Sequence, residues 1–167
     1  LPDGTRVVLA PGSRLTVAAR YGDAAREVAL EGLAYFDVPH DDRRPFRVRA
    51  GPATVRDLGT AFTVRHDGGT AVAVHVVTGA VAFEPVGGQQ TATTPAPDRT
   101  LRAGDLGALA PDGTVRVRRG AASADDLAWT RRRLVYRGAP LAEVRADLRR
   151  WYGLELRFDD PALAERT

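Results

Sequence analysis

The sequence of 167 residues contains no cysteine, methionine, lysine, asparagine or isoleucine. Without cysteine, the chain has no disulfides, no thiolate metal ligands and no thiol nucleophile. Because lysine is absent, every basic side chain is an arginine; the codon bias of a GC-rich genome explains this, and we draw no function from it. The sequence also has no apolar run of about 18 residues and no basic-then-apolar leader, so it predicts neither a membrane span nor a signal peptide within these residues. We therefore expect a piece of a longer protein.

The composition that is present predicts a folded chain. Apolar residues make up 44% of it, which is enough for one or two domains with real cores. Residues 1–128 contain 15 arginines and 15 acidic residues, whereas residues 129–167 contain nine arginines and six acidic residues, so the net charge of +3 comes from the C-terminal part. The run Arg131-Arg132-Arg133 lacks interleaved aromatic residues, and we predict no nucleic-acid partner.

Short runs with period-two alternation, each bounded by Gly, Pro or Asp, dominate residues 1–119 and predict a mainly β domain there. Strands at a spacing of about ten residues are typical of a sandwich, a barrel or a β-solenoid, and we expect a β-solenoid or sandwich-like fold. The expected strands are 6–9, 14–18, 26–30, 34–38, 46–49, 54–58, 61–65, 71–77, 80–84, 100–103, 107–110 and 114–118. We expect residues 85–98 to be a long exposed loop.

One turn sequence occurs twice. Pro2-Asp3-Gly4-Thr5 stands near the start, and the same four residues return at 111–114. Gly supplies the positive φ that a tight reversal needs, and the tetrad at 66–69, which includes His66, has the same character. The repeat indicates two uses of one turn; a true internal duplication is the alternative.

After residue 119 the sequence changes character. Residues 120–133 are expected to be a linker, and residues 134–167 a small, partial α/β unit of strand, helix and strand. Pro140 marks the first turn of the expected helix and Gly153 its end, and the strands are expected at 134–137 and 154–158. The apolar residues at helical spacing are Leu141, Val144, Leu148 and Trp151.

Motifs for chemistry are scarce. His40, His66 and His75 lack metal-ligand spacing, and the sequence has no nucleophile elbow and no phosphate-binding loop. We therefore predict no catalytic residue, no cofactor and no metal, and a protein that is not an enzyme. A jelly-roll enzyme would need a ligand cluster. A glycan- or cell-wall-binding β module is the alternative function; it would need exposed aromatics, for which only Tyr21, Tyr136 and Trp151 are candidates.

Ordered sequence motifs resemble the FecR family over nearly the whole chain. They are "LPDGTRVVL", "LEGLAYFDV", "RPFRV", "DLGTAFTV", "VHVVTGAVAF" and "LRAGDLGAL". The tail "LVYRGAPLAEVRADLRRWYGLELRF" is similar to the C-terminal domain of that family and to the secretin and TonB short N-terminal domain. At Leu33 the sequence departs from the family, which more often has Glu there.

The resemblance implies the periplasmic part of a single-pass inner-membrane regulator of an extracytoplasmic-function sigma factor. Such an anti-sigma factor takes part in cell-surface signalling, for example in iron uptake. Its periplasmic partner would be the signalling domain of an outer-membrane TonB-dependent receptor. The sigma factor would be bound by a cytoplasmic segment, and the membrane crossed by a span, both outside this chain.

The tail is the expected partner-binding region, because it carries the net positive charge and a possible open sheet edge. Its apolar contacts would come from Leu134, Tyr136, Leu154 and Leu156, and Arg137 and Arg157 would steer an acidic partner. The competing interpretation is that the leucines pack under the helix. In the β domain, Phe46, Phe62, Val64 and Val74 are expected in the core, and Gly32, Gly79 and Gly104 at reversals or close backbone approaches.

Overall fold

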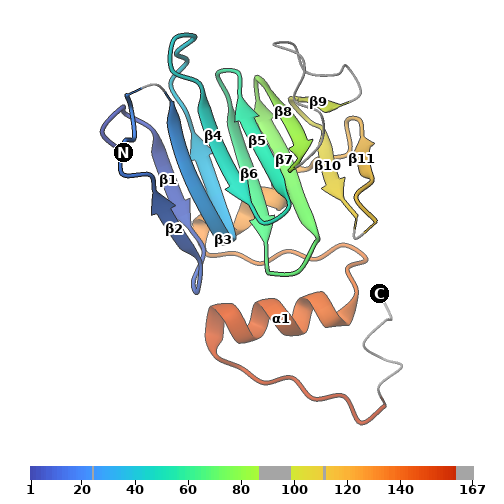
Figure 1. The fold of residues 1–167 in the computed structure, drawn as a ribbon. Coiled ribbons are helices and arrows are strands. Elements are labelled where there is room, and N and C mark those ends of the chain that lie inside the picture. The colour runs from blue at the N-terminus through green and yellow to red at the C-terminus, as the bar shows by residue number, and fades with distance from the viewer. Residues whose placement is uncertain (24, 87–98, 111, 161–167) are drawn as a thin grey trace. The chain divides into compact units, whose positions relative to one another are not determined.

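The computed structural model describes residues 1–23, 25–86, 99–110 and 112–160. The chain divides into two units, a β unit of Leu1–Leu9 and Ser13–Ser123, and a C-terminal unit of Ala10–Gly12 and Ala124–Thr167. Figure 1 shows the strands gathered in the first unit and the helix α1 in the second. Most of the loop expected at 85–98 lies outside the described residues.

The β unit confirms the mainly β prediction, with strands close to the expected positions. They are β1 (Arg6–Leu9), β2 (Arg14–Val17), β3 (Arg26–Asp37), β4 (Phe46–Ala50), β5 (Ala53–Asp57), β6 (Ala61–His66), β7 (Val72–Thr78), β8 (Ala80–Pro85), β9 (Thr100–Arg102), β10 (Leu106–Leu109) and β11 (Val115–Arg118).

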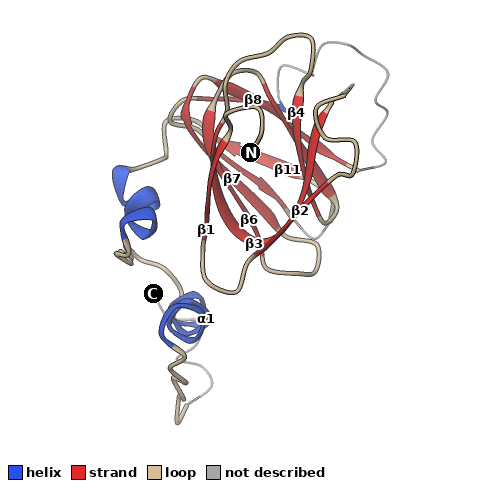
Figure 2. Ribbon diagram, turned by 90° about the vertical axis from the view of Figure 1, so that its left-hand side faces the viewer, coloured by secondary structure: helices blue, strands red, loops and turns tan. Residues whose placement is uncertain are grey.

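Strand β3 belongs to two sheets. Its first half pairs with β2 and with β4, and the second sheet continues through β5 and β8 to β9. Its second half pairs with β1 and β6, and that sheet continues through β7 and β10 to β11. Figure 2 shows these strands curving around a common interior. The strands therefore form one nearly closed, barrel-like sheet, with antiparallel pairing at every described ladder except β3 with β4.

Gly32 lets β3 pass from one sheet to the other. Its φ of 97° lies in the left-handed region, and a Cβ at this position would overlap the Ser13 side chain. The Ser13 hydroxyl instead accepts a hydrogen bond from the Leu33 N–H at 2.9 Å. The expected break between strands 26–30 and 34–38 was wrong, because the glycine bends the strand without ending its hydrogen bonding.

The core lies between the inner faces of the two sheets. Phe36 packs against Phe46 and Phe62, with ring centroids 5.6 and 5.3 Å apart, and all three rings are fully buried. Val64 and Val74 are also buried, which confirms the four predicted core residues. Alternation therefore identified the inward positions correctly.

Two glycines lie in the connections between strands at the corners of the β unit, and one of them is at a close backbone approach. Gly79, with φ 73°, joins β7 to β8, and a Cβ there would run into the Gly59 carbonyl. Beside this contact the Thr60 hydroxyl donates to the Ala80 carbonyl at 2.6 Å. Gly104, with φ 86°, lies in the turn between β9 and β10. The positions expected for these glycines are confirmed.

The C-terminal unit contains a 3-10 helix, η2 (Ala124–Arg131), within the expected linker, and α1 (Leu141–Tyr152). Pro140 precedes α1, and Gly153 ends it in the left-handed conformation with its N–H bonded to the Arg149 carbonyl, as predicted. Trp129 of η2 packs edge-on against Trp151 of α1 at 6.2 Å. Within the described residues no helix is long and apolar enough to cross a membrane.

The two strands expected beside α1 were wrong. Residues 134–137 and 154–158 have no strand assignment and do not pair with each other. A lone two-stranded ladder is marginal in water, because each strand satisfies only one edge and one face. The alternation in these two segments is typical of strands. Within the described residues, however, neither segment has a neighbouring strand to pair with.

Candidate functional site

Arg26 is the most unusual residue of the β unit, because a charged side chain is fully buried there, with 1% of its surface exposed. It is the first residue of β3 and shares its inward parity with Val28 and Leu30, which are core residues. A buried guanidinium must find acceptors for its donors, since an unpaired buried charge is strongly destabilising.

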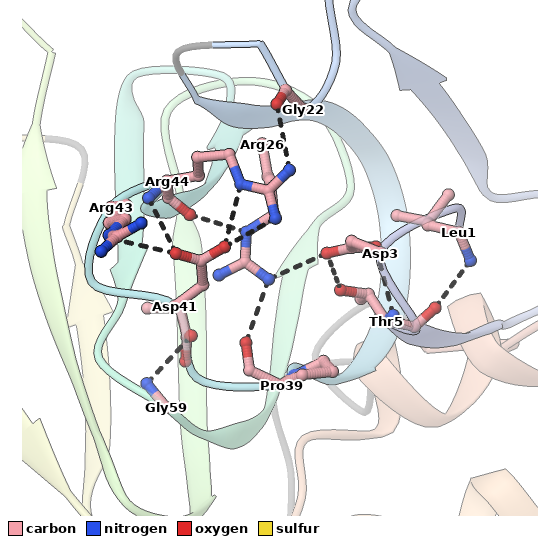
Figure 3. Close-up of polar contacts among 11 residues, drawn as sticks. Leu1, Asp3, Thr5, Gly22, Arg26, Pro39, Asp41, Arg43, Arg44 and Gly59 are labelled. Carbon is pink, nitrogen blue, oxygen red and sulfur yellow. Dashed lines mark hydrogen bonds and ion pairs between the residues drawn. The ribbon is translucent and has the colours of Figure 1, made fainter.

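Three residues from two segments supply those acceptors (Figure 3). Nη1 of Arg26 donates to Oδ2 of Asp3 at 2.9 Å and to the Pro39 carbonyl at 3.0 Å, and Nε donates to the Arg44 carbonyl at 2.7 Å. The guanidinium also lies over the Phe46 ring, 5.8 Å from its centroid. Arg26 therefore ties the N-terminal turn to both ends of the connection between β3 and β4.

Asp3 is held as a carboxylate by its neighbours. Oδ2 accepts from the Thr5 hydroxyl at 2.6 Å, and Oδ1 from the Thr5 N–H at 3.2 Å. Burial by itself would raise the pKa of Asp3, but the hydrogen bonds from Thr5 and Arg26 outweigh it and lower the pKa to about 2. Burial and the nearby Asp3 carboxylate raise the pKa of the Tyr21 hydroxyl to about 12.

The two copies of the turn sequence have different surroundings. In the second copy, Asp112 accepts the Thr114 N–H at 2.9 Å, and that hydrogen bond lowers its pKa, but the contact is exposed and involves no buried cation. The local turn chemistry is shared, because an aspartate that accepts the N–H two residues on favours a reversal. Among the described residues of the two copies, an ion pair to a core residue is found at Asp3 of the first copy.

Asp57 is a second buried carboxylate of the β unit. It ends β5, is 5% exposed and accepts the Gly59 N–H at 3.0 Å. Burial raises its pKa, and the Thr60 hydroxyl, the Gly59 N–H and the charges of Arg26 and His40 oppose that effect without overcoming it. This region of the β unit thus holds one stabilised carboxylate and one that is poorly compensated.

These groups can stabilise a fold, but their geometry shows no arrangement for catalysis. Arg26 and Asp3 satisfy each other in a closed network, and neither is accessible to a substrate. In the described ranges no three His, Asp or Glu side chains form a group that could hold a metal ion. The turn expected at His66 was wrong. His66 is the buried last residue of β6, and its Nδ1 lies 3.2 Å from the Ala71 carbonyl oxygen.

The predicted partner-binding residues before α1 contact the helices of their own unit. The Tyr136 hydroxyl lies 3.3 Å from Oδ2 of Asp147 on α1, and Nε of Arg137 donates to Oδ2 of Asp125 on η2 at 2.6 Å. Leu134 is half-buried. Arg137 is therefore engaged in an ion pair, although 78% of its side chain is exposed.

The predicted residues after α1 are more open. Leu154 is 56% exposed, whereas Leu156 is half-buried. Nη2 of Arg157 lies 3.5 Å from Oε2 of Glu155, which is a weak and solvent-exposed contact.

The sequence interpretation missed the cluster around Arg26. Arg26 stands at an inward position of an alternating strand, and this parity was the available signal. Asp3 was recognised only as a turn residue and Asp57 only as part of a family motif. The pairing of Arg26 with Asp3 joins residues 23 positions apart, which no local pattern contains.

The FecR family model, whose description is FecR protein, matches residues 1–82. Two crystal structures of a candidate anti-sigma factor from Parabacteroides distasonis ATCC 8503 are similar to the chain. The first has a TM-score of 0.82 and 27% identity, and the match covers 99% of this chain and 74% of that chain. The second has a TM-score of 0.77 and 28% identity, with 96% and 74% covered. A search of curated proteins gave no match.

Proposed function

We propose that the chain is the signal-receiving part of a membrane-anchored anti-sigma factor. It belongs to the FecR family through residues 1–82, and proteins of that family are regulators. In this proposal the chain lies in the periplasm and transmits a signal from a TonB-dependent outer-membrane receptor to an extracytoplasmic-function sigma factor. A membrane span and a sigma-binding segment outside these residues would complete the route.

The observation that carries the proposal is the match of both units together. The family model spans the strands from β1 into β8, and the similarity to the anti-sigma factor candidate extends over 99% of the chain, so it includes the C-terminal unit. In the part of the chain that the structure describes, the β core shows no group of side chains that could hold a metal ion, which suits a protein that acts through contacts.

We place the receptor contact on the C-terminal unit. The apolar contacts are Leu134, Tyr136, Leu154 and Leu156, and the steering charges are Arg137 and Arg157. The exposure of Leu154 supports this placement, since a leucine that is 56% exposed is available to a partner. The segment 154–158 has the alternation of a strand but no described ladder, and a partner strand would supply one through main-chain hydrogen bonds.

A titration with the periplasmic signalling domain of the cognate receptor tests this contact. We expect Arg157→Glu and Leu154→Ser each to weaken binding at least about tenfold, because one removes steering charge and the other apolar contact, without lowering the melting temperature. Arg47→Glu, an exposed arginine of β4 in the β unit, is the matched control and should leave affinity unchanged.

Two results would contradict the proposal at different levels. Normal receptor binding by both tail variants would remove the contact residues from it. Absence of any effect on a sigma-dependent reporter, when the gene for the full-length protein is deleted, would contradict the regulatory function itself.

A further inference from the structure

Strand β11 ends one sheet of the β unit, and within the described residues no strand pairs with its outer side. An unpaired edge presents main-chain donors and acceptors to any strand that approaches. From the charge on this edge we propose that β11 is a docking site for an extended acidic segment of a partner protein, separate from the receptor contact on the C-terminal unit.

The hydrogen-bond register identifies which main-chain groups are free. The Ala110 N–H donates to the Thr114 carbonyl at 2.9 Å, so 110 and 114 form a hydrogen-bonded pair of the β10–β11 ladder. Such pairs alternate along antiparallel strands, and the next ones are therefore Ala108 with Arg116 and Leu106 with Arg118. The N–H and C=O groups of Val115 and Val117 consequently point to the open side.

The side chains on this edge divide by face. Val115 and Val117 are half-buried against the core, whereas Arg116 and Arg118 are exposed on the outer face. A docked antiparallel strand would bond to the two valines and place its own alternate side chains opposite the two arginines. Those positions would be non-hydrogen-bonded pairs, in which side chains approach closely.

On two other edge strands, β1 and β2, an arginine has an acidic cross-strand neighbour, and β11 lacks such a neighbour. Arg6 on β1 lies opposite Asp37, and Arg14 on β2 lies opposite Glu31, with 4.0 Å between their charged groups. On β11 the cross-strand neighbours are Ala108 and Leu106 instead. No ion pair joins Arg116 or Arg118 to a carboxylate among the residues that the structure describes.

The charges of Arg116 and Arg118 also decide which kind of strand can pair with the open edge of β11. A second copy of β11 in an antiparallel dimer would bring arginines against arginines, which is destabilising. A strand that alternates apolar and acidic residues would instead extend the apolar inner face, and its carboxylates would neutralise the charges of Arg116 and Arg118 on the outer face. Edge charges also protect sheets from indiscriminate pairing, so only a strand with carboxylates on its outer face fits.

The test uses the whole chain and a peptide of about eight residues that alternates valine and glutamate, a typical strand length. In hydrogen-exchange NMR we expect the peptide to protect the amides of Val115 and Val117, while those of Arg116 and Arg118 change little because β10 already holds them. A valine–lysine peptide of equal length is the control and should give no protection.

Two variants separate the contributions. Arg116→Glu with Arg118→Glu should weaken binding of the acidic peptide at least about tenfold. Val117→Pro should abolish binding with the β10 ladder kept, because it removes an N–H that points outward. Equal affinity for both peptides, protection elsewhere, or protection of Val115 and Val117 by the concentrated chain alone would overturn the proposal. None of these results bears on Leu154 or Arg157, so the receptor contact is tested separately.

Discussion

Asp3 and Asp57 are two buried carboxylates of one β unit, and their pKa values move in opposite directions. Asp3 forms a direct ion pair with Arg26 at 2.9 Å, and its pKa falls to about 2. Asp57 feels the charge of Arg26 without an ion pair to it among the described residues, and burial raises its pKa. The difference shows that the direct ion pair with Arg26, added to the hydrogen bonds from Thr5, overcomes the effect of burial on Asp3. At Asp57 the hydrogen bonds and the more distant charges do not overcome it.

Of the substitutions that test this comparison, one at Arg26 should have the largest effect on stability. Arg26→Met keeps the volume and the Phe46 contact but leaves Asp3 buried without its cation, and we expect a loss of about 3 to 5 kcal/mol in the free energy of unfolding. Urea denaturation measures this. The double variant with Asp3→Asn should recover part of the loss, because no uncompensated charge remains; a double variant as unstable as the single one would contradict this reason.

Asp3→Asn alone should cost about 2 kcal/mol at pH 7, because the carboxylate is bound more tightly when the chain is folded. A folded pKa below the unfolded value of about 3.9 means that this stability is complete above pH 4 and is lost as the pH falls toward 2. Unfolding curves of both proteins from pH 7 to pH 2 should therefore converge. A constant difference would show that Asp3 acts through shape and not through charge.

Asp57→Asn should have a smaller effect of opposite sign. Because the folded pKa is raised, the charged form lowers stability above the unfolded pKa, and protonation removes that cost as the pH falls through the folded pKa. We expect the variant to be more stable than the parent at pH 7, by at most about 1 kcal/mol, and equal to it at low pH. A less stable variant at pH 7 would mean that the carboxylate is satisfied.

Asp112→Asn should have the smallest effect and sharpens the comparison between the two turns. The turn is exposed, and Asn also accepts the N–H two residues on, so the melting temperature should change by less than about 2 °C. Thermal unfolding beside Asp3→Asn checks this. A large shift would show that the second turn has a buried role.

The sequence made much of the β unit predictable, because each strand exposes one face to water and buries the other. Alternation identified Phe62 and Val64 as core, and the glycines located the reversals. The predicted break between strands 26–30 and 34–38 was wrong, because Gly32 bends a strand that continues. The partner-binding role of the C-terminal residues stays a prediction. The strands expected on either side of α1 were wrong, because a period-two pattern does not show whether another strand lies beside the segment.

By itself, the sequence determined the strands, the ends of α1 and the FecR motifs, since these depend on side-chain alternation, proline, glycine and short ordered words. Only the tertiary structure decided that Arg26 meets Asp3, that Asp57 lacks such an ion pair, and that β11 keeps an open edge. Each of these depends on which distant segments become neighbours. Hydrogen bonds and burial act over a few ångströms in space, and residues far apart along the chain satisfy them only after the sheets have formed.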